Sequence, residues 1–251
     1  MKANTENSNK EKITVISLAR DVQTSEVMVT LQSEYRGKTV IKTVSRDTIT
    51  VSGLRELSKY GFPTLTKTDI DEFLNYFTAN ESDFPMVNIY QKVGWHEIGG
   101  KDYFLHRKPL ADGKVKNGIY KGKLDLSRKG SIDDVIIFFD NNLREAIGLQ
   151  TACAVSLASA IVGRVKNKDL RFIFHIEGTS TSGKTTTLKL AGSLWGNPQI
   201  MPNGVVKNWN ITGNKLVQSA GGNNGVLICL DELAMSNTDN TQLTYLLTGG
   251  N

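Results

Sequence analysis

A glycine-rich turn followed by lysine and threonine is the strongest chemical signal in this chain. Its residues, Gly178-Thr179-Ser180-Thr181-Ser182-Gly183-Lys184-Thr185-Thr186, contain the phosphate-loop pattern Gly-x-x-x-x-Gly-Lys-Thr. Backbone N–H groups of such a turn surround a phosphate, and the next helix adds its free amides and positive dipole end. Lys184 would contact the outer phosphates, and the Thr185 hydroxyl would bind Mg²⁺. The pattern therefore predicts a site for ATP and Mg²⁺ over residues 178–186.

Two adjacent carboxylates form the second half of the expected site. Asp231 and Glu232 end the apolar run Val226 to Leu230, which follows a turn rich in glycine and asparagine. We expect this run to be a central parallel strand, because the carboxyl ends of such strands carry the chemistry. Asp231 would hold the magnesium, and Glu232 would polarise the water that attacks the terminal phosphate. A water-activating carboxylate favours a hydrolytic, motor-type ATPase over a kinase.

These groups need particular elements around them. The run Phe172–Ile176 predicts a buried strand before the loop, and Thr185 to Trp195 predicts the helix after it. The loop and the acidic pair should then lie on neighbouring β elements. The expected fold class is α/β, with a P-loop NTPase core built on a parallel sheet of the RecA or AAA+ kind. After Glu232 there is room for one helix, Thr241 to Leu247, so we expect a truncated core. Its sensor residue and arginine finger would lie beyond residue 251, leaving the chain weak or inactive as an ATPase by itself.

The N-terminal half is β-rich and predicts a smaller α+β domain. Its β-rich runs, separated by turn residues, predict an antiparallel meander: Ile13–Leu18, Glu26–Gln32, Lys38–Val44 and Thr48–Val51. A short helix, Ser52 to Tyr60, should follow, and then a helix capped by Thr68 with Asp71. A strand from Met86 to Val93 is expected to pair with Tyr103–Leu105.

The chain is thus divided into a disordered polar tail (1–12), a β-rich domain (13–107), a linker or hairpin rich in glycine and lysine (108–130), and the ATPase domain (131–251). Ser131 with Asp134 should cap a short helix, and a long helix should run from Asn142 to Val165. Its apolar stretch is interpreted as a helix buried in a soluble core rather than a membrane span. We therefore expect a cytoplasmic protein without membrane association.

Bulk composition sets wide limits. The chain has 251 residues, 39% hydrophobic and 22% charged, which is typical of soluble globular proteins. A net charge of +5 is compatible with nucleic acid but does not establish it. Cys153 and Cys229 lie in apolar surroundings without metal-ligand spacing, so they predict buried core residues in a reducing compartment. His175, inside an apolar run, is expected to be a core histidine.

Several further residues have two interpretations. Trp95 and Trp195 are expected to be packing anchors rather than base-stacking platforms, because each ends an element. Trp209 and Asn214 lie where a substrate-facing or subunit-facing loop often occurs, and a functional role there is left open. Four lysines beside Tyr120 would either hold a phosphate backbone or form a solvated hairpin, and we favour the hairpin: Lys114, Lys116, Lys121 and Lys123.

From Met86 to Gly249 the chain resembles a bacterial and phage family known as domain of unknown function 927. The shared residues are Gly94-Trp95-His96, Gly100, Tyr103-Phe104-Leu105, Pro109, Ser182 to Leu188, Leu194-Trp195-Gly196, Trp209, Thr212, Asn214 and Leu230 to Leu233. Members are described as helicase-like or primase-associated ATPases of mobile elements. The resemblance implies an ATPase that works on DNA, with single strands favoured, as a homo-oligomeric ring or filament. The first eighty residues match no family that we can name.

Three functions remain open at this point. The first is an ATP-driven DNA translocase or helicase. The second is a P-loop kinase that transfers phosphate to an acceptor. The third is a nucleotide-gated DNA-binding or loader module in which hydrolysis is slow.

Overall fold

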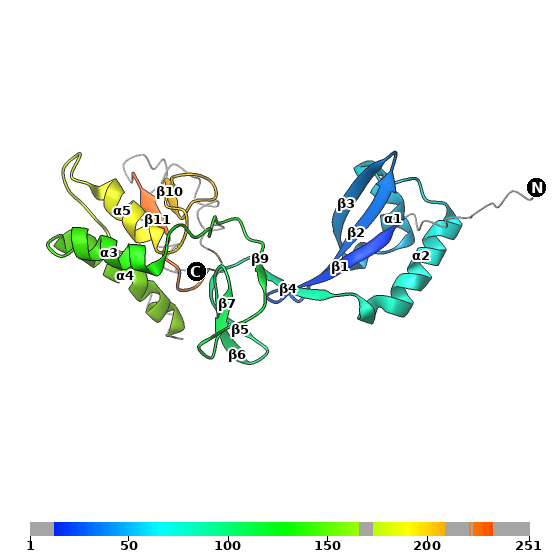
Figure 1. Cartoon of the computed structure of the whole chain (residues 1–251), viewed down its shortest axis with the longest axis horizontal. Helices are drawn as coiled ribbons and strands as arrows, with labels where there is room; N and C mark the ends of the chain where they lie inside the picture. The colour runs from blue at the N-terminus through cyan, green and yellow to red at the C-terminus, as the bar shows by residue number, and fades with distance from the viewer. Residues whose placement is uncertain (1–12, 166–172, 209–220, 222, 233–251) are drawn as a thin grey trace, which may run out of the picture. The chain divides into compact units, whose positions relative to one another are not determined.

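The computed structural model describes residues 13–165, 173–208, 221 and 223–232 (Figure 1). The chain divides into two compact units, Met1–Ile89 and Tyr90–Asn251, which are described separately below. The division falls at Ile89 rather than after residue 107. The physical reason is that residues following Val93 pair with a segment near Asn224, far along the chain, and so belong to the second unit.

The first unit is built on a sheet with the strand order β3-β2-β1-β4. Strands β1 (Thr14–Asp21), β2 (Val27–Tyr35) and β3 (Lys38–Ser45) form the predicted antiparallel meander. Strand β4 (Met86–Tyr90) lies parallel to β1, with Leu18 opposite Met86. The predicted pairing of this strand with Tyr103–Leu105 is therefore wrong. A parallel partner needs a long crossover, and the local sequence pattern does not show which strand the crossover reaches.

Helices form that crossover. The predicted fourth strand, Thr48–Val51, is wrong: a 3-10 helix η1 (Arg46–Thr48) and α1 (Val51–Glu56) occupy this stretch. Thr50 caps α1, because its hydroxyl accepts a hydrogen bond from the Gly53 N–H at 3.2 Å. A 3-10 helix η2 (Leu57–Tyr60) then ends at Gly61, whose φ of 87° explains the predicted stop there.

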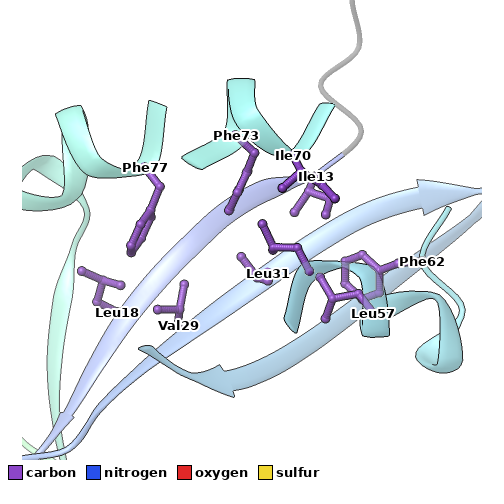
Figure 2. Close-up of a cluster of buried hydrophobic side chains, with 10 residues drawn as sticks. Ile13, Leu18, Val29, Leu31, Leu57, Phe62, Ile70, Phe73 and Phe77 are labelled. Atoms are coloured by element: carbon purple, nitrogen blue, oxygen red, sulfur yellow. The ribbon is translucent and has the colours of Figure 1, made fainter. Parts of the chain in front are cut away.

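Helix α2 (Lys67–Asn80) covers the sheet and is followed by a 3-10 turn η3 (Glu81–Asp83). Its capping box uses Thr66 and Asp69, two residues before the predicted pair Thr68 and Asp71. Both pairs fit the same spacing, so the spacing alone does not show at which residue the helix begins. The apolar face of α2, formed by Ile70, Phe73 and Phe77, is buried. It packs over Leu18, Val29 and Leu31 of the sheet (Figure 2).

The second unit begins with a four-stranded antiparallel sheet. Its strands are β5 (Gly94–Ile98), β6 (Lys101–Leu105), β7 (Pro109–Ala111) and β8 (Lys114–Val115), in that order. β7 and β8 form a tight hairpin in which Ala111 lies opposite Lys114. Its turn residues, Asp112 and Gly113, have φ of 52° and 69°, the left-handed conformation that such turns require. A short strand β9 (Ile119–Tyr120) follows.

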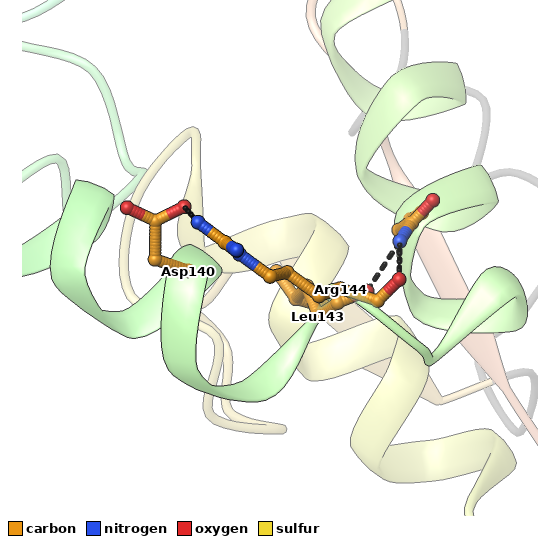
Figure 3. Close-up of polar contacts among 4 residues, drawn as sticks. Asp140, Leu143 and Arg144 are labelled. Atoms are coloured by element: carbon orange, nitrogen blue, oxygen red, sulfur yellow. Dashed lines mark hydrogen bonds and ion pairs between the residues drawn. The ribbon is translucent and has the colours of Figure 1, made fainter.

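Two helices follow the sheet segment. Helix α3 (Ile132–Asn142) has the predicted capping box of Ser131 and Asp134. Helix α4 (Ile147–Arg164) begins after a turn that is fixed by polar contacts (Figure 3). In this turn the Gln150 amide donates to the carbonyls of Leu143 and Arg144, the latter at 2.9 Å. The Arg144 guanidinium lies 3.4 Å from Asp140.

Helix α4 is only partly buried, which corrects the prediction of a helix enclosed in a core. Ala152, Cys153 and Ser156 are buried, whereas Leu157 and Ile161 are 52% and 71% exposed. The small residues on one face allow close contact with other elements, and the larger apolar residues lie on the other face. Within the described residues, α4 is long and apolar enough to cross a membrane by length and composition.

The remaining elements form the core of the second unit. They are α5 (Lys184–Ser193) and two parallel strands, β10 (Val206–Asn208) and β11 (Cys229–Asp231). α5 (yellow) lies beside β11 (orange) in Figure 1. Both cysteines are buried and free, as predicted. The strand predicted over Val226–Leu230 is found only in part: β11 begins at Cys229, lies parallel to β10, and is preceded by the buried Val226.

Candidate nucleotide-binding site

The glycine-rich turn leads directly into helix α5. Gly183 is its N-cap residue, with φ of 86°, and Thr181 is also left-handed with φ of 64°. No side chain caps the helix, so its first amides are not covered by a hydroxyl or carboxylate of the chain. A helix start of this kind is suited to an anion. Residues Thr179, Ser180, Ser182 and Gly183 are exposed.

Lys184 lies over the turn. Its Nζ donates to the carbonyls of Gly178 at 2.8 Å and Thr179 at 2.7 Å. An ammonium group has three donors and can exchange these carbonyls for phosphate oxygens. A Cβ at Gly178 would lie 2.9 Å from the Ser182 hydroxyl oxygen, which explains a glycine there. The turn is therefore closed around its own lysine.

The predicted strand before the turn is not found in the described residues. Residues 173–178 have no strand assignment, and Ile173 and Phe174 are each 46% exposed. Apolar residues of a strand become buried when neighbouring strands pair with it. In the described residues β10 and β11 pair with each other, and neither pairs with residues 173–178. His175 is exposed too, which corrects its interpretation as a core histidine. Phe172 lies outside the described residues.

The acidic pair lies at the carboxyl end of β11. Asp231 is 7% exposed, and Glu232 is exposed. Glu232 has φ of 62°, a conformation that costs a non-glycine residue free energy and is concentrated at functional sites. Its N–H donates to the Asp231 carboxylate at 3.0 Å. Two adjacent residues therefore present different carboxylates: that of Asp231 is buried, and that of Glu232 is accessible to solvent.

Asn208, the last residue of β10, also lies at the carboxyl end of these strands. It was not identified as a site residue from the sequence. It lies opposite Asp231 in the parallel register, and its Nδ2 donates to Glu232 Oε2 at 3.3 Å. Its Oδ1 is buried without a hydrogen-bond partner among the described residues. The signal was present: two valines and a lysine precede a polar residue, the pattern of a short strand with a polar carboxyl end.

Helix α5 connects the turn to the acidic strand. The Cys229 thiol lies 3.6 Å from the Leu188 carbonyl. A Cβ on Gly192 would lie 3.0 Å from Val205 and 3.6 Å from the Cys229 sulfur. Leu188 and Gly192 of α5 therefore both pack against the first residue of the acidic strand. The expectation that the turn and the acidic pair lie on neighbouring β elements is not met in the described residues: helix α5, rather than a paired strand, connects the turn to β11.

The cysteines and histidines do not supply an alternative chemistry. Burial, followed by the nearby Asp231 charge, raises the pKa of the Cys229 thiol to about 12, so it is a neutral packing group. Burial lowers the pKa of His106, whose Nε2 lies 2.7 Å from the Trp195 carbonyl. In the described part of the chain no cluster of three His, Cys, Asp or Glu side chains would hold a metal ion. Magnesium would need only Thr185 and Asp231, because phosphate oxygens and water supply the other ligands.

Both predicted tryptophan anchors pack against helix α4. Trp95 Nε1 donates to the Ala160 carbonyl at 2.7 Å, and Trp195 Nε1 donates to the Ser156 hydroxyl at 2.9 Å. The Ser156 hydroxyl in turn donates to the Ala191 carbonyl of α5 at 2.7 Å. The two indoles thus contact α4 at positions one turn apart, Ser156 and Ala160. Their interpretation as packing anchors is confirmed.

The Gly94-Trp95 pair also positions the segment that leads into β11. Trp95 N–H donates to the Asn224 carbonyl at 2.7 Å, and Asn224 N–H donates to Val93 at 3.0 Å. A Cβ on Gly94 would lie 1.8 Å from the Asn224 carbonyl oxygen, so only glycine fits. The start of the acidic strand is therefore fixed by residues much earlier in the chain.

The fold is mixed α/β, and in the second unit a glycine-rich turn leads into a helix that packs on an acidic parallel strand. The chain belongs to the family described as Domain of unknown function (DUF927), whose model matches residues 2–251. The match extends over the first eighty residues, to which no family could be assigned from the sequence motifs.

One solved structure extends this comparison. It is "SCCmec type IV Cch - active helicase", with a TM-score of 0.68 and 23% sequence identity. The alignment covers 91% of this chain and 45% of that chain, so this chain spans less than half of the helicase. At this identity the likeness concerns the fold. No curated protein matches the chain.

Some predicted residues cannot be placed. Trp209, Thr212, Asn214, Leu233 and the expected helix Thr241 to Leu247 lie outside the described residues, as does the tail 1–12.

Proposed function

We propose that this chain binds ATP with Mg²⁺ and forms part of a helicase-like motor ATPase that acts on nucleic acid in a mobile element. The observation that carries the proposal is the position of Lys184 over its own turn, at the uncapped start of α5. The packing of α5 against the strand that ends in Asp231 supports it. Family membership and the likeness to a helicase fold support the nucleic-acid partner.

Each residue then has a defined role. The amides from Gly178 to Thr186 bind phosphate oxygens, and Lys184 leaves the Gly178 and Thr179 carbonyls to contact the outer phosphates. Thr185 and Asp231 would hold Mg²⁺, which neutralises charge on those phosphates. Glu232, accessible and held by Asn208, orients the attacking water and accepts its proton.

The partner and the assembly belong to the same proposal. A motor of this class works on DNA, with single strands as the preferred form, and acts as a homo-oligomer in the cytoplasm. The slow, nucleotide-gated module is the second candidate, because Asn208 already occupies a Glu232 oxygen.

The first test is nucleotide binding with Lys184→Ala. We expect the affinity for a fluorescent ATP analogue with Mg²⁺ to fall about 10- to 100-fold, because charge-assisted hydrogen bonds are worth about 1.5–3 kcal/mol. Lys189→Ala, a lysine substitution in the same helix, is the matched control and should retain wild-type affinity. Equal affinities for all three proteins would refute the site.

A second measurement separates the candidate functions. Glu232→Gln should leave ATP affinity unchanged and abolish release of free phosphate, because only the water-activating group is lost. Labelled phosphate on an acceptor would indicate a kinase instead. Binding without any phosphate release by the complete wild-type protein, with and without DNA, would favour the nucleotide-gated module.

A further inference from the structure

One short segment carries all of the net positive charge of the protein. Residues 107–129 contain eight cationic side chains against two carboxylates, a net charge of +6, whereas the whole chain has +5. Six are lysines: Lys108, Lys114, Lys116, Lys121, Lys123 and Lys129. The others are Arg107 and Arg128. The rest of the chain therefore has almost no net charge, and the basic character is local.

These cations are accessible and not neutralised. All except the half-buried Lys116 are exposed. Among the described residues, the ion pairs of the molecule involve none of the eight. The Asp125 carboxylate accepts from the Asn197 amide at 2.9 Å and the Ser127 N–H at 3.0 Å. Asp112 lies in the β7–β8 turn. Asp125 attracts Lys129, but two carboxylates against eight cations leave the segment with its net charge of +6.

The fold gathers parts of this segment around a pocket. Arg107, Lys108, Tyr120 and Ser127 line an open pocket of about 270 Å³ together with Gly118, Ile119 and Leu126. The Lys116 N–H donates to the Pro109 carbonyl at 2.8 Å, which holds the end of the hairpin beside β7. A Cβ on Gly118 would lie 2.8 Å from Pro109, so the chain passes closely there. The two cations at the start of the segment, Arg107 and Lys108, thus line one pocket with Tyr120 and with Leu126 and Ser127 from near its end.

An aromatic ring is fixed in this pocket. The Tyr120 ring lies 5.8 Å from the Tyr90 ring, and its hydroxyl accepts the Leu124 N–H at 2.9 Å. Two apolar side chains are exposed among the lysines, Val115 at 69% and Ile119 at 46%. Cations alternating with an aromatic ring and apolar surface suit a polymer with both phosphates and bases.

We propose that residues 107–129 form the surface on which this protein binds single-stranded nucleic acid. The lysines and arginines contact backbone phosphates, and the Tyr120 pocket receives an unstacked base. This replaces the solvated hairpin favoured from the sequence. A duplex would engage only the charges, because its base faces are stacked. The inference rests on the nucleic-acid part of the proposed function and not on its nucleotide site.

The charge is tested with fluorescein-labelled oligothymidylate, without nucleotide, by anisotropy on the whole chain. Lys114→Gln with Lys116→Gln should weaken binding about tenfold, and the slope of log K against log salt should fall by about 1.4, because each cation contributes about 0.7 for single strands. The matched control, Lys38→Gln with Lys67→Gln, removes two exposed lysines of the first unit. It should keep both affinity and slope. Equal effects of the two double variants would overturn the proposal.

The pocket is tested with two further variants and an abasic strand of equal length. Tyr120→Leu should weaken oligothymidylate binding at least fivefold, because stacking on an aromatic ring is worth about 1–3 kcal/mol per base. It should leave abasic binding unchanged. Tyr120→Phe keeps the ring and should bind as the wild type does. Equal losses on both strands would contradict a base pocket, and binding to anionic phospholipid vesicles without oligonucleotide binding would overturn the proposal in favour of a membrane surface.

Failure of this inference is distinguishable from failure of the proposed function. The oligonucleotide measurements contain no ATP, and the Lys114 and Lys116 variant should bind the ATP analogue like the wild type. Absence of oligonucleotide binding with intact ATP binding would remove the surface and leave the nucleotide site.

Discussion

At the scale of single residues, Asn208 decides how the accessible carboxylate is used. Glu232 extends from a left-handed backbone position, and the Asn208 amide is the group that holds its Oε2. We expect Asn208→Ala to lower the rate of ATP hydrolysis about three- to tenfold and to change ATP affinity less than twofold, because a loss of orientation affects the chemical step rather than binding. Phosphate release and analogue binding measured on the same preparation of the complete protein would test this.

The control for Asn208 is Asn203→Ala, on the segment before β10 and away from Glu232. It should leave hydrolysis unchanged. If Asn208→Ala weakens ATP binding as strongly as it slows hydrolysis, Asn208 contacts the nucleotide and does not position Glu232.

His106 gives the second unit a pH-dependent stability. Burial is the largest effect on it and lowers its pKa, while the Trp195 carbonyl acts in the opposite direction. A histidine whose pKa is lower in the folded state takes up more protons when unfolded, so stability is lost as the pH falls below about 6.5. The free energy of unfolding in urea, measured from pH 7.5 to pH 5, should fall less steeply for His106→Gln than for the wild type. The exposed His175→Gln should follow the wild-type curve, and identical slopes for His106→Gln and the wild type would exclude this linkage.

At the scale of elements, local sequence patterns predicted that the helices exist, but their exact first residues depend on contacts with distant parts of the chain. The capping box of α3 was found at the correct residues because Ser131 and Asp134 act within one turn. The box of α2 was placed two residues too late, because Thr66–Asp69 and Thr68–Asp71 fit the same spacing. Which pair caps the helix depends on the sheet it must cover.

Strand partners were harder to predict from the sequence than helices. β4 was expected beside Tyr103–Leu105 and pairs with β1 instead, because only the complete unit shows which edge is free. The glycine-rich turn was located from its own residues, yet the strand expected before it was not found in the described residues, since burial there depends on neighbours and not on apolar composition. Asn208 was missed for a related reason: its role comes from register with Asp231.

At the scale of the whole molecule, the two units have separate cores, which should give them separate stabilities. The first core is centred on the α2 face over β1 and β2, and the second joins Trp195, Val206 and Cys229. Two-state unfolding holds for single cooperative units, so a chain of two such units is expected to show two transitions in calorimetry. Each transition should respond only to substitutions in its own core.

Gly163→Ala tests this in the second unit. A Cβ at Gly163 would lie 2.3 Å from the Gly225 Cα, so backbone must move at a cost of about 1–3 kcal/mol. Gly148→Ala in the same helix meets no atom within 4 Å and should be neutral or stabilising by up to about 1 kcal/mol. Phe73→Ala, which removes about 3–5 kcal/mol from the first core, should lower only the other transition. A single transition that shifts with both Gly163→Ala and Phe73→Ala would show that the two units unfold as one, and the substitutions would then report on a shared core.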